Sequence, residues 1–431
     1  MVHSWGRAHK FDHQVASPAY LQDTALTSNQ ASPTTIFGQG RSYGDVALND
    51  GGRIVQTGSL KRIQTVNWET GVIRAEAGMT LDQVLQVSVP RGWFLPVTPG
   101  TKYVSLGGAV ANDVHGKNHH HVGSFGAHVR KLGLRRSTGE QMLLSREENA
   151  DLFALTISGL GLTGFIEWVE FQLVPVRSAS VIVENIPYGS LDEFYQLSND
   201  SKGWPYVVAW IDCFAGNKAL GRGVFSRGKH SLMPDGRAAH RPDPRLTWPI
   251  QTPGWLLNRT SIGLFNKLYR HRPGARYCGR VPYDPFFYPL DGIAQWNRLY
   301  GARGFYQHQC IVPLDEAKKA MTALLTAINA AGQGSFLAVM KNHGAEKSPG
   351  LNTFCLEGTS LALDFANRGD RTLKLLKTLD EIVLKHGGRL YPAKDGTMSA
   401  EMYKTGYPNW QKLEDARDPA LNSAFWQRVT R

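Results

Sequence analysis

Four glycine-rich segments within the first 164 residues constrain the fold more than any other feature of the sequence. They lie at 38–45 (GQGRSYGD), 99–108 (PGTKYVSLGG), 116–126 (GKNHHHVGSFG) and 159–164 (GLGLTG). Glycine lets a turn aim several backbone N–H groups into one concavity, and it permits close approach by a ligand or a neighbouring backbone. The first segment therefore fits either an anion-binding loop or an ordinary tight turn. The second precedes a predicted short helix and allows close approach by a ligand or by backbone.

The segment 159–164 matches the pattern G-x-G-x-x-G, but we do not interpret it as a dinucleotide-binding motif. That motif requires a strand before it and a helix after it. Here helical spacing over 149–158 precedes the glycines, and an alternating strand over 165–176 follows them. The order of elements is wrong for that motif.

The periodicity of apolar residues predicts three parts of α+β type. In the first part, up to residue 176, we expect strands at 53–58 and 72–78, a helix over 80–89 capped by Thr80, and a hairpin of 132–135 with 141–144. In the second part, 177–388, units of strand and helix predict an antiparallel sheet covered on one face, with elements at 180–184, 191–197, 206–214, 304–312, 315–331 and 335–341. The third part follows an amphipathic helix over 372–386 and is helical in pieces, interrupted by Pro408 and Pro419.

One long stretch, 226–270, shows little periodicity. A loop of that length inside a folded domain is usually functional or mobile. We therefore interpret it as a lid or a surface-docking segment.

Composition and charge narrow the class of protein. The chain has 431 residues, enough for two or three domains, and a formal net charge of +12, which favours anionic partners such as nucleic acid, acidic lipid headgroups or phosphorylated substrates. No apolar run approaches the roughly 20 residues of a membrane span, and the first residues lack the apolar stretch of a signal peptide. The four cysteines form no Cys-x-x-Cys, so we expect buried free thiols at Cys213, Cys278, Cys310 and Cys355.

Histidines gather in the third glycine-rich segment. A pair spaced like His115 and His119 can bind a metal on one face of a helix, but Gly116 and Asn118 disfavour a helix there. We therefore predict no metal site and expect the segment to provide donors around a bound cofactor; its histidines are His115, His119, His120, His121 and His128.

Taken together, these motifs resemble the FAD-linked oxidases of the vanillyl-alcohol-oxidase superfamily. The resemblance rests on the Arg-Ser-Tyr-Gly-Asp loop, the Pro-Gly-Thr loop, and the segments 113–120 and 123–126. Further matches are 5–7 (WGR), 159–164, 289–291 (PLD), 296–297 (WN), 307–309 (QHQ) and 388–395 (GRLYPAKD). The similarity spans nearly the whole chain. Among members of the superfamily, the chain most resembles those that oxidise a polyprenylphosphoryl ribose.

The resemblance implies a two-domain fold of the PCMH or VAO type. A discontinuous FAD domain would comprise 1–176 and 389–431, and an antiparallel-sheet substrate domain would comprise 177–388. The residues implied as FAD contacts are Gly38, Gln39, Gly40, Arg41, Ser42, Tyr43, Pro99, Gly100, Thr101, Gly107, Gly108, Ala109, His115, Gly116, Tyr391 and Ala393. Those implied as substrate contacts are His115, Lys117, Gln307, Gln309, Lys341, Ala362 and Lys394.

The implied catalytic residues are Lys394, Lys117, Tyr43 and Gln309. Oxidation of an alcohol by flavin moves a hydride to the ring and a proton to a base. A cation beside the ring stabilises its reduced form, and a buried lysine with a lowered pKa can act as the base. Lys394 and Lys117 are the two candidates, and the sequence leaves open which has which role.

The sequence departs from the family pattern at two positions that bear on its chemistry. Members that link FAD covalently place a histidine after the glycine of the first loop, whereas this chain has Arg41, so we predict dissociable FAD. A relative has a pocket cysteine where this chain has Ala362, so thiol-directed covalent inhibitors should not form an adduct here.

The resemblance implies oxidation of the ribose 2′-hydroxyl of a polyprenylphosphoryl ribose to a ketone, followed by reduction by a short-chain dehydrogenase partner to give an arabinose donor. We expect a cytoplasmic protein, with peripheral contact at an anionic inner membrane through the basic region 226–280. An aldonolactone or sugar-alcohol oxidase that uses oxygen is the alternative. A nucleic-acid-binding protein is a third possibility, but the chain has neither a helix-turn-helix signal nor an aromatic-basic repeat, and we expect no nucleic-acid partner.

Overall fold

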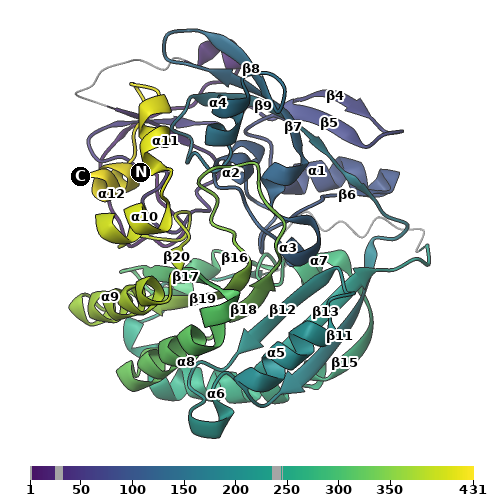
Figure 1. Cartoon of the computed structure of the whole chain (residues 1–431), viewed down its shortest axis with the longest axis vertical. Coiled ribbons are helices and arrows are strands. Elements are labelled where there is room, and N and C mark those ends of the chain that lie inside the picture. Colours follow the sequence, from purple (N-terminus) through teal and green to yellow (C-terminus); the bar gives the residue numbers. More distant parts are fainter. Residues whose placement is uncertain (1, 25–32, 235–243, 245) are drawn as a thin grey trace.

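Two large β-sheets organise the chain in the computed structural model, which describes residues 2–24, 33–234, 244 and 246–431 (Figure 1). One sheet has five strands in the order β4-β5-β9-β7-β8, and the other has eight in the order β15-β11-β13-β12-β18-β19-β17-β20. The first part of the chain and the C-terminal helices lie together in the upper half of Figure 1, and the middle of the chain forms the lower half. The predicted α+β class is confirmed.

Short strands separated by glycine turns make up the first part. A parallel three-stranded sheet consists of β1 (Gln14–Ala16), β3 (Arg53–Gln56) and β2 (Thr34–Phe37). The antiparallel five-stranded sheet consists of β4 (Ile63–Asn67), β5 (Val72–Glu76), β9 (Phe165–Gln172), β7 (Val129–Arg135) and β8 (Gln141–Ser145). After β9 the chain continues as β10 (Val174–Pro175), which pairs with β6 (Trp93–Phe94). The strands and the hairpin predicted in this part are confirmed.

Helix α1 (Leu81–Ser88) begins directly after the predicted cap. The Thr80 hydroxyl accepts from the Gln83 N–H, and the Gln83 side chain accepts from the Thr80 N–H. This capping box satisfies amides that the first turn of a helix otherwise leaves free.

A buried lysine connects α1 to the middle of the chain. Lys102 is only 1% exposed, and its Nζ lies 3.1 Å from the Asp82 carboxylate of α1 and 2.7 Å from the Asp284 carboxylate of α7 (Tyr283–Phe287). The Lys102 N–H also donates to Asp291 at 2.8 Å. These contacts join the two halves of the molecule through its interior.

The segment 159–164 follows α4 (Ala150–Thr156) and precedes β9, so the order of elements is the one predicted. Gly164 has φ +153°, and a Cβ there would lie 2.9 Å from the Arg135 carbonyl oxygen. This glycine therefore permits the loop to pack against the end of β7, and the segment is not a dinucleotide-binding motif.

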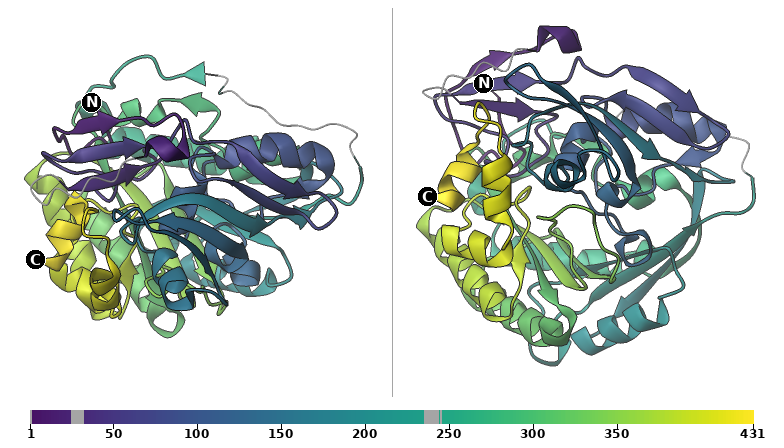
Figure 2. Two further views of the ribbon diagram at one scale, coloured as in Figure 1. Left: turned by 90° about the horizontal axis from the view of Figure 1, so that it is seen from above. Right: turned by 45° about the horizontal axis from the view of Figure 1, so that its top comes forward.

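The eight-stranded sheet is antiparallel, and helices cover one of its faces, as predicted (Figures 1 and 2). Its strands are β11 (Ser180–Tyr188), β12 (Tyr206–Ile211), β13 (Gly223–His230), β15 (Tyr277–Pro282), β17 (Phe305–Pro313), β18 (Ala338–His343), β19 (Gly358–Ala366) and β20 (Arg389–Leu390). The covering helices are α5 (Leu191–Asp200), α8 (Leu314–Ala331) and α9 (Asp370–Lys385).

Alternation along these strands separates a core face from a cavity face. Residues such as Ala209, Met340 and Leu363 are fully buried in the core with α8 and α9. Their neighbours in sequence, such as Trp210, Val339 and Ala362, line a cavity. The uncovered face of the sheet is therefore the wall of a site.

The prediction of a long loop over 226–270 is wrong in two places. Strand β13 extends to His230, and helix α6 (Arg259–His271) occupies the end of the stretch. The Asn258 side chain accepts from the N–H groups of Thr260 and Ser261 and caps α6. Residues 235–243 and 245 of the predicted lid lie outside the described residues.

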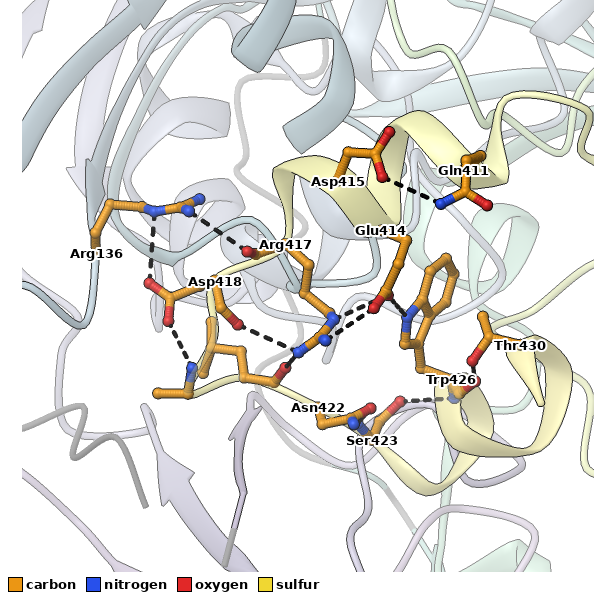
Figure 3. A network of polar contacts seen from close by, with 12 residues as sticks. Arg136, Gln411, Glu414, Asp415, Arg417, Asp418, Asn422, Ser423, Trp426 and Thr430 are labelled. Atoms are coloured by element: carbon orange, nitrogen blue, oxygen red, sulfur yellow. Dashed lines mark hydrogen bonds and ion pairs between the residues drawn. The ribbon is translucent and has the colours of Figure 1, made fainter. Parts of the chain in front are cut away.

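The C-terminal segment packs on the first part of the chain. It consists of α10 (Ala400–Gly406), α11 (Trp410–Ala416) and α12 (Ala424–Thr430), with breaks at Pro408 and Pro419 as predicted. The Arg428 guanidinium lies 2.8 Å from the Asp45 carboxylate, and Asp418 accepts from the Ser137 N–H at 2.7 Å. Figure 3 shows Asp418 also facing Arg136, 3.5 Å away. The boundaries 1–176, 177–388 and 389–431 stay a prediction.

The cysteines are free, and three of them are buried as expected: Cys213, Cys310 and Cys355. The expectation was wrong for Cys278, which is exposed on β15 because the alternation of that edge strand points it away from the core. Among the described residues, no helix has both the length and the apolar character needed to cross a bilayer.

Candidate active site

A cavity of about 1080 Å³ lies against the uncovered face of the eight-stranded sheet. Its other walls come from the glycine-rich loops of the first part and from the segment that follows β20. The cavity is lined by residues 38–43, 99–101, 107–108 and 115–117, together with Tyr391, Ala393 and Lys394. Its volume suits a cofactor and a substrate better than one small ligand.

The first glycine loop and the Tyr-Pro-Ala-Lys segment are in direct contact. The Tyr43 N–H donates to the Ala393 carbonyl at 2.9 Å, and the Lys394 Nζ lies 3.9 Å from the centroid of the Tyr43 ring. A Cβ at Gly44 would lie 1.5 Å from the Asp395 carbonyl oxygen, so only glycine allows this approach. Two regions about 350 residues apart in the sequence, which the family resemblance assigns to one ligand, meet at one wall.

The first loop presents donors of the kind that a diphosphate needs. Within the described part of the chain, the N–H groups of Gly40, Arg41 and Ser42 donate to no acceptor. The Arg41 guanidinium lies 4.4 Å from the centroid of the Trp5 ring, and its Nε is buried without a hydrogen-bond partner. Successive free amides beside a cation form an anion-binding concavity, so the residues present fit FAD.

The second loop leads into α2 (Leu106–Ala111), whose first turn is capped by the Ser105 hydroxyl. Gly107 packs closely, since a Cβ there would lie 3.0 Å from the Cβ of Ala77, whereas Gly100 has open space on its side-chain face. Ala109 is fully buried and is not among the cavity-lining residues. The helix points this side chain into the core, and the role of Ala109 as a cofactor contact stays a prediction.

Three lysines face the cavity: Lys341 is buried, and Lys117 and Lys394 are half-buried. Lys117 donates to the carbonyl oxygens of Phe286 and Phe287, and burial together with nearby Lys341 lowers its pKa to about 7. Burial also lowers the pKa of Lys341 to about 8. The pKa of Lys394 is lowered by burial, and the negative charge of Asp364 opposes that shift.

His115 links two of the predicted substrate contacts. The Lys341 Nζ lies 2.9 Å from His115 Nδ1, and the Gln309 Nε2 lies 2.8 Å from His115 Nε2. Burial, followed by the charge of Lys341, holds the pKa of His115 well below its usual value, so the ring is neutral. This chain of contacts fixes three polar side chains at the same end of the cavity.

Asp364 is a cavity residue that the sequence analysis missed. Its carboxylate accepts from the Gln307 amide at 2.6 Å and from the Tyr300 hydroxyl at 3.2 Å. Burial raises its pKa, while these hydrogen bonds and the charge of Lys394 oppose the rise. The available signal was the period-2 spacing that places Asp364 on the same strand face as Ala362.

Ala362 lines the cavity and pairs in register with Gln309 of β17 and Val339 of β18. Gln307 and Tyr43 line it too, so every residue with an implied substrate or catalytic role is brought to this one space. The roles themselves stay predictions.

The histidines of this part of the chain lie in two different environments. His115 faces the cavity, whereas His119 begins the short α3 (His119–Val122) and packs against His343 of β18, with ring centroids 4.5 Å apart. Cys355 completes a buried group whose candidate ligand atoms lie within 4.8 Å of one another. The charge of Lys341 acts on both histidines and disfavours a cation there, and the prediction that no metal binds stays a prediction.

Comparison with known proteins identifies the class of enzyme to which this site belongs. Residues 13–145, which contain three of the glycine-rich segments, match the FAD binding domain family. The chain is an FAD-dependent oxidoreductase that acts on CH–OH groups.

Over nearly its whole length the chain belongs to the family of decaprenylphosphoryl-beta-D-ribose oxidase. The protein of that name from Mycolicibacterium smegmatis is 35% identical over 396 residues, which is 89% of this chain and 85% of that protein. An uncharacterized protein in the mprA 5′ region of Streptomyces coelicolor is 30% identical over 362 residues, 79% of this chain and 96% of its own length. An L-gulono-1,4-lactone dehydrogenase of Mycobacterium tuberculosis is 23% identical over 425 residues, 93% of this chain and 90% of its own.

Proposed function

We propose that the protein oxidises the 2′-hydroxyl of a polyprenylphosphoryl-β-D-ribose to the 2′-keto sugar. The observation that carries the proposal is one cavity that combines FAD-type donor loops, three lysines with lowered pKa values and a long apolar wall. The similarity to the ribose oxidase of M. smegmatis supports the same substrate class.

When bound, FAD supplies the acceptor for the hydride that leaves the carbinol carbon. The hydroxyl proton must then pass to a base of the protein as the C–O bond becomes a carbonyl. Lys117 is the better base, because its pKa of about 7 leaves a large neutral fraction at neutral pH. Burial lowers the pKa of Lys394 and Asp364 opposes that shift, so we expect this lysine to keep its charge at neutral pH, where an ammonium would stabilise negative charge on a bound flavin.

The remaining polar groups position the sugar. Gln309 and Lys341 hold the neutral His115 ring from its two nitrogens, so its orientation is fixed before substrate binds. Gln307 is held in the same way by the Asp364 carboxylate. Groups that are already oriented lose little freedom when the substrate arrives.

We propose that residues 1–176 and 389–431 together form the FAD domain and that 177–388 form the substrate domain. Support comes from the contacts of the C-terminal helices with the first part, through Arg428 and Asp418. FAD is held non-covalently, because Arg41 stands where covalently linked relatives have a histidine. Acid precipitation should therefore leave a colourless pellet and a yellow supernatant, and a yellow pellet would contradict this proposal.

A ketone product needs a reductase to complete an epimerisation. We propose a short-chain dehydrogenase as the partner that consumes the product, and a cytoplasmic location with peripheral contact at the inner membrane. Co-purification of tagged protein with a dehydrogenase that reduces the keto sugar tests the first point. Cell fractionation at low and high salt tests the second.

The experiment for the reaction itself is anaerobic mixing of the holoenzyme with a polyprenylphosphoryl ribose. We expect the flavin absorbance near 450 nm to bleach, a general property of flavin reduction. The matched control is the 2′-deoxyribose analogue, which lacks the reacting hydroxyl and should leave the spectrum unchanged. Bleaching by an aldonolactone but not by the ribose substrate would favour the alternative that the lactone dehydrogenase similarity represents.

A further inference from the structure

The cavity face of the eight-stranded sheet changes character across the sheet. At β17, β19 and β18 it presents polar side chains, namely Gln307, Gln309, Ser360, Asp364 and Lys341. On the three strands that follow across the sheet, β12, β13 and β11, the residues of the same face are mostly apolar, namely Val208, Trp210, Val224 and Val183. The cavity is therefore polar where the loops of the first part meet it and apolar toward β15.

Helix α6 lines the apolar end. Ile262 and Phe265 line the cavity from one side of the helix, and Val281 of β15 lines it from the sheet. Tyr269 and Arg272 line the cavity as well, with the Arg272 guanidinium 3.4 Å from the centroid of the Tyr269 ring. In Figure 1, α6 lies at the lower edge of the molecule, at the end opposite the sheets of the first part.

The other side of α6 is apolar where a soluble helix is normally polar. Leu264 is 58% exposed and Leu268 is 63% exposed, and the spacing of i, i+3, i+4 and i+7 places them in one stripe with Lys267 and His271. The turn before the helix adds Trp255, which is 73% exposed and whose carbonyl accepts from the Asn258 side chain. Neither leucine nor Trp255 lines the cavity.

The charged residues in the sequence of this region are all basic. Between residues 246 and 283 the sequence contains no Asp or Glu, and its basic residues are Arg259, Lys267, Arg270, Arg272, Arg276 and Arg280. Within the described part of the chain, no carboxylate pairs with Lys267, Arg270 or Arg276. Exposed leucine and tryptophan among basic residues such as Lys267 and Arg276 is the composition of a surface that rests on anionic lipid.

We infer that the apolar end of the cavity holds the hydrocarbon chain of the substrate, and that the outer face of α6 docks on an anionic phospholipid bilayer from which this chain enters. The inference rests on the proposed function, because it assigns the lipid part of that substrate. The polar end receives the sugar, since the hydroxyl must reach the lysines. The inner and outer faces of one helix then join the site to the membrane.

Co-sedimentation of the holoenzyme with vesicles tests the docking surface. We expect wild-type protein to pellet with phosphatidylglycerol vesicles and not with pure phosphatidylcholine, and added salt should weaken the binding. The double variant Leu264→Asp with Leu268→Asp should bind at least tenfold more weakly. The control, Leu314→Asp with Leu373→Asp, changes two exposed leucines at the starts of α8 and α9 and should bind like wild type.

Turnover separates a failure of docking from a failure of the proposed function. On a short, water-soluble prenylphosphoryl ribose the α6 variant should reduce its flavin at the wild-type rate, and on the long-chain substrate in vesicles it should be at least tenfold slower. Bleaching by both substrates with equal sedimentation of variant and wild type would overturn the docking surface and leave the oxidation intact. Sedimentation that depends on the two leucines, without bleaching by any polyprenylphosphoryl ribose, would overturn the oxidation instead.

Discussion

The two ends of the cavity differ in how they are built. The polar end joins loops near residues 41, 100 and 116 to three neighbouring strands and to the segment around Lys394, and its side chains hold one another through hydrogen bonds. The apolar end consists of alternate residues on β11, β12 and β13 and one side of α6, and most of the side chains that line it there are apolar, although Trp210 donates to the Phe336 carbonyl at 2.9 Å. From this difference we infer that the polar end carries out the proposed reaction and that the apolar end selects the substrate.

The largest effect should come from the lysines of the polar end. Lys117→Met removes the proposed base, and Lys394→Met removes the cation beside the ring, so each should slow flavin reduction by about 100-fold or more. Stopped-flow measurement under anaerobic conditions checks this. Val208→Ala, at the apolar end, serves as the control and should reduce its flavin within about threefold of wild type at saturating substrate. Equal losses in all three variants would remove the contrast between the two ends.

Substitutions at the apolar end should change how kcat/KM depends on the length of the substrate's hydrocarbon chain. Val224→Asp places a carboxylate on the apolar wall, so kcat/KM for a long-chain substrate should fall about 10- to 100-fold. The same variant should lose less than about threefold on a short prenyl analogue that does not reach β13. A similar loss on both substrates would mean that this wall contacts the sugar.

The pH dependence follows from Lys117. A base with a pKa of about 7 is protonated at lower pH, so the rate of flavin reduction should fall about tenfold per pH unit below 7 and level off above it. Lys117→Arg keeps a cation at this position that does not lose its proton, so the slow rate should no longer rise through this range. An unchanged rise in that variant would assign the base to another residue.

A smaller effect is expected from Asp364→Asn. Loss of the carboxylate removes the charge that opposes deprotonation of Lys394, so the pKa of Lys394 should fall further. Flavin reduction should slow by roughly three- to tenfold above neutral pH and less at lower pH. Gln307→Glu provides a comparison in the same cluster. If Asp364→Asn slowed flavin reduction equally at all pH values, the role of Asp364 would be purely structural.

The smallest effect on flavin reduction is expected from the removal of metal ions. Prolonged treatment with EDTA should leave flavin reduction unchanged, since we predict that no metal binds at His119, His343 and Cys355, whose candidate ligand atoms lie within 4.8 Å of one another. Elemental analysis of the holoenzyme before and after treatment provides the direct measurement. Stoichiometric zinc or copper, lost together with activity, would contradict the prediction.

Local features of the fold and the site could be predicted from the sequence, whereas Asp364 and helix α6 could not. The Thr80 and Gln83 capping box and the glycine loops act through local geometry, and the convergence of Tyr43 with Lys394 followed from motifs. Asp364 was missed because its partners depend on the register that pairs it with Gln307 across two antiparallel strands, which no short motif encodes. Helix α6 was missed although it is amphipathic, because the sequence around it is rich in proline, glycine and arginine.

Burial of Lys102 limits how the substrate reaches the lysines. If α1 and α7 moved apart, its ammonium would lose Asp82 or Asp284 in the interior, at a cost of about 3–5 kcal/mol. Wide separation of the halves is therefore a rare event. If α6 docks as proposed, we expect substrate and product to exchange past this helix while the molecule stays closed, so that lateral diffusion of the lipid, rather than opening of the protein, sets how often the site is refilled.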